Sequence, residues 1–127
     1  MKFIFSFLAL LFCIFKIDGV FAIEILENKT AFDNFLKTSK LAVVEFSATY
    51  CEACKYLEPQ LENLAKSHGK IKFAKIDVPS NQQLANEQGA NSMPTVICYT
   101  NGKKWHTHVG ADIVPLQQKV EMMNKIA

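Results

Sequence analysis

Two cysteines stand three residues apart in the segment Cys51-Glu52-Ala53-Cys54, directly after an apolar run and directly before a helical pattern. Side chains at this spacing on a helix lie on one face, so the two thiols are close enough to form and break a disulfide. Unpaired N–H groups and the positive end of the helix dipole stabilise a thiolate on the first cysteine. The spacing predicts a redox pair in which Cys51 is the nucleophile and Cys54 the resolving thiol.

Two alternatives to a redox role stay open. A zinc site needs a second pair of ligands, and outside the N-terminal leader only Cys98 and three scattered histidines remain. A purely structural disulfide fits an exported protein, although so small a loop removes little chain entropy. His106 and His108 share a face of an expected strand but lack a clear third ligand, so we expect no bound metal and no other cofactor.

The first 22 residues predict a cleaved secretory signal peptide, which leaves a mature domain over residues 23–127. The segment has a basic start, an apolar core, and small residues at the last and third-last positions of Val20-Phe21-Ala22. The apolar core is shorter than the roughly 20 residues of a membrane span, and an uncleaved signal anchor is the alternative. We expect a protein of the secretory pathway, secreted or in a lumenal compartment beyond the endoplasmic reticulum, with no stable membrane association after cleavage.

Composition and one short motif fit an exported single-domain protein. The 14 basic residues are all lysine and nearly balance the 12 acidic ones. The absence of arginine removes the usual bidentate fork for phosphate, so we expect no nucleic acid as a partner. The mature length suits one compact domain, which we expect to be a monomer. Asn28-Lys29-Thr30 is a glycosylation sequon, which makes Asn28 a candidate glycosylation site in an exported chain.

Strand and helix patterns alternate along the mature region. Apolar runs predict strands over residues 23–26, 41–46, 71–78, 95–99 and 103–109, the last two joined by the turn Asn101-Gly102. Helical spacing predicts four helices. The first is capped by Thr30, the second follows the cysteines and ends at Gly69 with Pro59 inside, the third spans residues 82–87, and the last runs from Asp112 onwards. This order predicts an α/β fold with a central mixed sheet and helices on both of its faces.

The element order, with the cysteine pair at the end of the second strand, resembles the thioredoxin family over almost all of the mature chain. Residues 43–55 look like the family's strand and active-site segment, and Pro59 falls where the family has its kinking proline. Ser92-Met93-Pro94-Thr95 is similar to the family's cis-proline loop, and Val109-Gly110-Ala111 resembles its substrate-groove glycine. The resemblance implies a thioredoxin fold whose five strands lie in the order 1-3-2-4-5.

The same resemblance implies roles for residues around the thiols. A groove for an extended substrate segment should be bordered by Tyr50, Met93, Pro94 and Gly110. Glu45 and Lys75 stand in apolar strands where the family carries a buried acid and a buried lysine, and there the acid shuttles protons for the second cysteine. Independently of the family, an acid forced into a core should have a raised pKa, which suits proton exchange near neutrality. An inert buried ion pair of Glu45 with Lys75 is the alternative.

The implied activity is a thiol-disulfide oxidoreductase that acts on protein disulfides and exchanges electrons with an unidentified donor or acceptor. Its direction stays open, because Glu52 beside Cys51 should disfavour the thiolate and favour a reducing couple, whereas glutamate at position 45 leans toward the isomerase-like branch of the family. The alternative function is a redox-capable accessory subunit of a larger secretory or surface assembly. Cys98 is expected to be a buried inert thiol, with regulatory oxidation or an intermolecular disulfide as its alternative.

Overall fold

A computed structural model describes residues 22–127, so the predicted signal peptide lies outside the described residues apart from Ala22. The elements are β1 (Ile23–Ile25), α2 (Lys29–Lys37), β2 (Leu41–Ser47), α3 (Glu52–Ser67), β3 (Lys72–Asp77), α4 (Gln82–Gln88), β4 (Thr95–Thr100), β5 (Lys103–Val109) and α5 (Ile113–Lys125). They form one mixed sheet in the order β1-β3-β2-β4-β5, which confirms the predicted fold. The strands β1, β3 and β2 run parallel, whereas β4 and β5 pair antiparallel.

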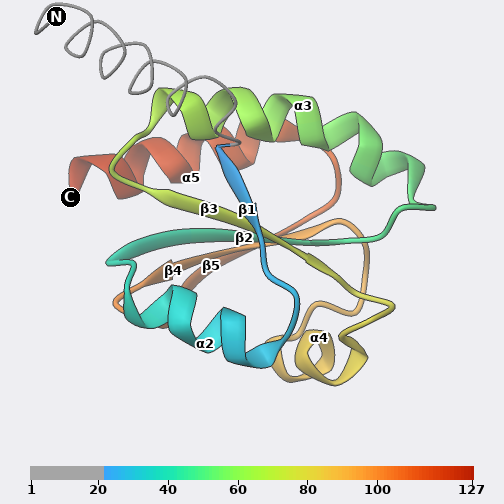
Figure 1. Cartoon of the computed structure of the whole chain (residues 1–127). Coiled ribbons are helices and arrows are strands. Elements are labelled where there is room, and N and C mark those ends of the chain that lie inside the picture. Colours follow the sequence, from blue (N-terminus) through green and yellow to red (C-terminus); the bar gives the residue numbers. More distant parts are fainter. Residues whose placement is uncertain (1–21) are drawn as a thin grey trace, which may run out of the picture.

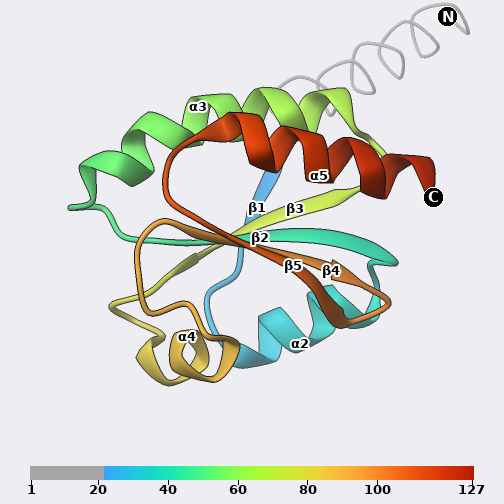
Figure 2. The same ribbon diagram turned by 180° about the vertical axis from the view of Figure 1, so that it is seen from behind.

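The strand β2 lies at the centre of the sheet, and all seven of its residues are buried. Figures 1 and 2 show why: α3 and α5 cover one face of the sheet, and α2 and α4 cover the other. Val44 and Phe46 pack beneath α2 and α4, while Val43 packs beneath α3 and α5. Because side chains alternate along a strand, Glu45 points to the same face as Val43, toward α3 and α5.

The first helix begins earlier than the sequence predicted. Its N-cap is Asn28, whose Oδ1 accepts a hydrogen bond from the backbone N–H of Ala31 at 2.9 Å. The prediction of Thr30 as the cap was wrong, since Thr30 lies within the first turn of α2. Asparagine ranks above threonine as a helix cap, which explains the choice. The residue that forms the sequon therefore also closes the end of the helix.

Other predicted ends agree with the structure. Asn101 and Gly102 both have positive φ, 51° and 79°, as a tight hairpin turn between β4 and β5 requires. Asp112 caps α5 by accepting a hydrogen bond from the N–H of Val114 at 3.1 Å. Pro59 lies inside α3. Within residues 22–127, every helix is too short or too polar to cross a membrane.

Candidate functional site

The two cysteines of the predicted redox pair are joined as a disulfide at the N-terminus of α3, with Cα atoms 5.2 Å apart. Cys51 is the N-cap residue, and its Sγ accepts a hydrogen bond from the N–H of Cys54 at 3.1 Å. Cys51 is partly exposed, whereas Cys54 is buried. The backbone N–H and the helix dipole favour negative charge at the Cys51 sulfur, which is also the sulfur that a second protein can reach.

Glu52 introduces negative charge next to Cys51, but its side chain is highly exposed. Its Oε1 lies 3.2 Å from the Nζ of Lys55, one turn along α3. This exposed ion pair partly neutralises the carboxylate, and solvent screens what remains. The effect of Glu52 on the Cys51 thiolate is therefore smaller than the sequence alone indicated.

The predicted groove residues lie at the edge of the sheet where β2 ends and β4 begins. Phe46 pairs with Thr95 across β2 and β4, so the end of β2 that leads to Cys51 lies beside the start of β4. There the Met93–Pro94 peptide is cis, and the carbonyl of Pro94 accepts a hydrogen bond from the N–H of Gly110 at 2.9 Å. The φ of Gly110 is +104°, a value that favours glycine.

Exposed apolar surface flanks this edge. Tyr50, directly before Cys51, is 68% exposed, and Val109, directly before Gly110, is 61% exposed. Both side chains offer apolar area to a docked chain, and Val109 is the register partner of Thr95, two residues after Met93. The structure thus brings Pro94 and Gly110 together and places Tyr50 on the segment that leads to the thiols, while a role of these residues as a substrate groove stays a prediction.

Glu45 is fully buried on β2, and neither oxygen of its carboxyl group has a hydrogen-bond partner among residues 22–127. Burial is the main cause of a raised pKa for this group, the charge of Glu58 adds to it, and Lys75 opposes both. Together they raise the pKa of Glu45 from 4.5 to about 8. An acid with such a pKa holds its proton at neutral pH and can release it to a nearby base.

Lys75 lies next to Glu45 on the neighbouring strand β3, since the two residues are register partners. Its Nζ, however, pairs with the Oε1 of Glu58 on α3, at 3.1 Å. The ion pair of Lys75 is thus formed with Glu58, while Glu45 remains its neighbour in the sheet. Both Lys75 and Glu58 keep a third of their side-chain surface exposed, so pairing there costs less dehydration than pairing with a fully buried carboxylate.

Glu58 is the residue of this site that the sequence analysis missed. It lies four residues after Cys54 on α3, and side chains at that spacing share a helix face. Since Cys54 faces the sheet, a glutamate four residues later has its carboxylate within reach of the strands. This spacing was a usable signal for a second acid beside Glu45.

The remaining candidate residues lie apart from the disulfide or are closed to solvent. Cys98 is buried in β4 outside any disulfide, and burial raises the pKa of its thiol to about 12. His106 is only partly exposed, and its burial together with the charges of Lys119 and His108 lowers its pKa. Asn28 is exposed at the start of α2. No three metal-binding side chains cluster in a way that could hold an ion in the part of the chain that the structure describes.

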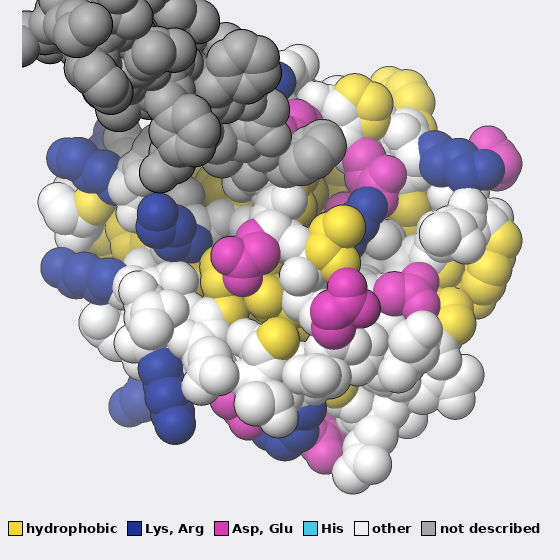
Figure 3. Space-filling view, in the orientation of Figure 1, with side chains coloured by type: hydrophobic (Ala, Val, Ile, Leu, Met, Phe, Trp, Pro, Cys, Tyr) yellow, Lys and Arg dark blue, Asp and Glu magenta, His cyan; other side chains and the backbone are white. Residues whose placement is uncertain are grey.

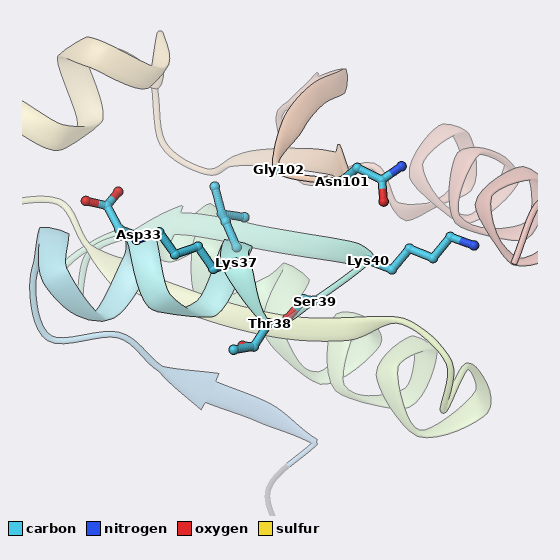
Figure 4. A pocket seen from close by; sticks show the side chains of 8 residues that line it. Asp33, Lys37, Thr38, Ser39, Lys40, Asn101 and Gly102 are labelled. Carbon is cyan, nitrogen blue, oxygen red and sulfur yellow. The ribbon is translucent and has the colours of Figure 1, made fainter.

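A cavity of about 680 Å³ opens at the opposite end of β2, between the end of α2 and the turn of the hairpin. Figure 4 shows that Lys40 extends away from Asp33, on the far side of the residues that line this cavity. Leu41 begins β2 at this end and Cys51 follows its other end. The cavity is thus separated from the disulfide by the length of the central strand.

Comparisons with known proteins agree with this geometry. The Thioredoxin family model matches residues 23–124. The chain is 31% identical to Thioredoxin 1 of Plasmodium falciparum over 99 residues, 78% of this chain and 95% of that protein. It is 36% identical to a thioredoxin of Gallus gallus over 98 residues, 76% of this chain and 93% of that protein. A solved structure of Plasmodium falciparum thioredoxin superimposes with a TM-score of 0.76 at 31% identity, covering 79% of this chain and 98% of that one.

Proposed function

Because this chain belongs to the thioredoxin family and is a thiol-disulfide oxidoreductase, we propose that it works in the secretory pathway on disulfides of other exported proteins. The accessible Cys51 at the N-terminus of α3, disulfide-bonded to a buried Cys54, is the observation that carries the chemistry. The apolar leader that ends at Ala22 supports the compartment. In an oxidising compartment the clients are proteins that carry disulfides of their own.

Reduction of a client disulfide proceeds in two displacements. The Cys51 thiolate attacks one sulfur of the client disulfide, forms a mixed disulfide, and releases the other client sulfur as a thiolate. Cys54 then gives up its proton and attacks the Cys51 sulfur, which closes the Cys51–Cys54 disulfide and releases the second client thiol. The client gains two electrons and the protein loses two, and the reverse sequence oxidises a client dithiol.

The proposed proton acceptor for Cys54 is Glu45. Cys54 must lose a proton within a buried site before it can attack, and the thiolate that forms would be poorly hydrated there. Glu45 is buried on the same face of the sheet, and its carboxyl group is free of hydrogen bonds to residues 22–127. With a pKa of about 8 most of Glu45 is protonated at neutral pH, so the ionised fraction accepts the proton, and that fraction grows as the pH rises toward 8.

The exposed edge beside the thiols is the proposed docking surface. An extended client segment would lie along Met93 and pair with its backbone, with Tyr50 and Gly110 on either side. The peptide groups of an extended segment supply the binding, and the exposed apolar side chains of this edge add contact area without selecting a particular sequence. The surface therefore suits many clients rather than one.

Expression of the Cys54→Ser variant with its leader in a secreting host tests the function and the compartment together. We expect mixed disulfides with client proteins through Cys51, visible as a reducible high-mass band, and a mature N-terminus at or near Ile23. The Cys51→Ser variant is the matched control and should trap almost nothing. An intact leader on membrane-embedded protein would overturn the proposed compartment. Equal trapping by both variants would overturn the roles of the two cysteines, and a single stoichiometric partner would favour an accessory subunit.

A further inference from the structure

A cavity of about 580 Å³ lies between β1 and α3 and is bordered by Glu45. Its other lining residues come from three elements: Ile23, Glu24 and Ile25 from β1, Glu58 and Glu62 from α3, and Lys75 from β3. Figure 3 shows acidic side chains gathered over the middle of the face on which β1 lies, with lysines spread along the left edge. A buried carboxyl group without a hydrogen bond to residues 22–127 thus borders a space with three further carboxylates and one ammonium.

The single lysine of this cavity is the charge that could pair with Glu45, and it is engaged elsewhere. Lys75 lies beside Glu45 in the register of β3 and β2. Its Nζ reaches instead across the cavity to Oε1 of Glu58, at 3.1 Å. Lys75 has one ammonium on a flexible stem, so a change at Glu58 changes where that ammonium rests.

We propose that Glu58 is a positioning residue that holds the Lys75 ammonium away from Glu45, and thereby sets the pH range in which Glu45 exchanges its proton. The inference deepens the proposed function, because it rests on Glu45 as the proton acceptor of Cys54. Glu58 touches neither the client nor the reacting sulfurs. It acts through the position of Lys75 and through its own negative charge.

Two effects of Glu58 act on Glu45 in the same direction. Its carboxylate disfavours a second negative charge in the same cavity, and its ion pair withdraws the nearest positive charge. The other groups that face this region leave the balance to that pair. They are Glu62 and the reduced Cys54 of α3, the exposed Glu24 of β1, and the buried thiol of Cys98 on β4. His108 of β5 lies one strand further, beside Val96, and the remaining neighbours from β4 and α5 are apolar.

The test is the Glu58→Gln variant, which keeps the shape of the side chain and removes its charge. We expect the midpoint of Glu45 ionisation to fall by about one pH unit or more, because Lys75 is released toward Glu45 and a neighbouring negative charge is lost. Difference infrared spectra of the protonated carboxyl group, with Glu45→Gln as the blank, give this midpoint between about pH 5 and pH 9. Every variant is expressed with its leader in a secreting host, and the secreted mature chain is measured throughout.

The matched control is Glu62→Gln, which removes an acid one turn further along α3 in the same cavity and should leave the midpoint in place. Lys75→Met should raise the midpoint, and adding Lys75→Met to Glu58→Gln should cancel most of the fall seen with Glu58→Gln alone. If Glu58→Gln fails to fold, the rise in Lys75→Met still tests the position of the ammonium, and an unchanged midpoint there overturns the proposal.

The rate of disulfide reduction, measured over the same pH range, tests the positioning role of Glu58 separately from the proton-transfer role of Glu45. If the infrared midpoint and the pH profile of the rate fall together in Glu58→Gln, Glu58 positions Lys75 and Glu45 transfers the proton. If the Glu45 midpoint falls while the pH dependence of the reduction rate is unchanged, Glu58 positions Lys75 but Glu45 does not accept the Cys54 proton. If the midpoint in Glu58→Gln matches that of the unmodified chain or of Glu62→Gln, the proposal is overturned.

Discussion

Replacing Glu45 with glutamine should stabilise the oxidised protein by an amount that grows with pH. Burial first, and the charge of Glu58 second, raise the pKa of this carboxyl group from 4.5 to about 8. The unfolded chain releases the proton near pH 4.5, whereas the folded chain holds it until about pH 8. Folding therefore loses free energy as pH rises through this interval, and the loss is absent below it and complete above it. Glutamine has the shape of the protonated carboxyl group but does not ionise, so its contribution to the free energy of folding does not fall as the pH rises.

The size of the gain follows from the two pKa values. One pH unit corresponds to about 1.36 kcal/mol. At pH 7 the interval above 4.5 therefore corresponds to between about 3 and 4 kcal/mol, and at pH 8 to between about 4 and 5 kcal/mol. Water that enters the adjoining cavity lowers both figures, so we expect about 2 kcal/mol at pH 7 and less than about 1 kcal/mol at pH 5.

Urea unfolding of the oxidised protein at several pH values measures this gain. The midpoints of the Glu45→Gln variant and the unmodified chain should diverge steadily between about pH 5 and pH 8. Glu24→Gln is the control, because Glu24 lines the same cavity but is exposed. Glu45→Gln should also slow disulfide reduction, since an amide cannot accept the Cys54 proton. A difference in stability that stays constant with pH would refute the argument, because the carboxyl group would then have the same pKa in both states.

Two further predictions concern residues outside the redox pair. Asn28→Ala should lower the free energy of unfolding by about 1 kcal/mol because it removes the cap of α2, whereas Thr30→Ala also abolishes the sequon but keeps the cap. Equal urea midpoints for the two variants would contradict this role of Asn28. In the oxidised native protein Cys98 should resist alkylation near pH 8, because it is buried with a pKa of about 12, and Cys98→Ala should reduce disulfides at the normal rate. Rapid labelling of native Cys98 would contradict its burial.

The order of the elements and the place of the disulfide follow from local patterns, which explains why both could be predicted. The apolar run of β2 leads directly into the cysteine spacing at the start of α3, so neighbours in sequence define this edge of the site. The loop at Pro94 was reached through resemblance, because its nearness to Cys51 depends on the pairing of β4 with β2. Turn chemistry fixed the hairpin at Asn101 and Gly102.

The choice of partner for a buried charge could not be predicted in the same way. Glu45 and Lys75 were correctly placed on adjacent strands, and their register pairing makes them neighbours. Which carboxylate the ammonium joins depends on how much water each partner keeps, and Glu58 keeps a third of its side-chain surface exposed while Glu45 keeps none. Hydration of this kind is a property of packed surfaces rather than of spacing along the chain. The prediction of the α2 cap failed for a simpler reason, because Asn28 and Thr30 are both acceptable cap residues and lie only two positions apart.

The same difference in burial bears on the direction of the redox couple. Glu52 is beside Cys51 in sequence, but it is exposed and paired with Lys55, and an exposed ion pair is worth at most about 1 kcal/mol. The direct interaction of an exposed charge with a group about 4 Å away is also about 1 kcal/mol in water. For a two-electron couple about 1.4 kcal/mol corresponds to about 30 mV, so we expect Glu52 to move the potential by about 20 mV or less. Glu45 is distant in sequence yet buried, and charge there is screened far less. We therefore expect the balance between the dithiol and the disulfide to depend more on whether Glu45 carries its proton than on the dipeptide between the cysteines.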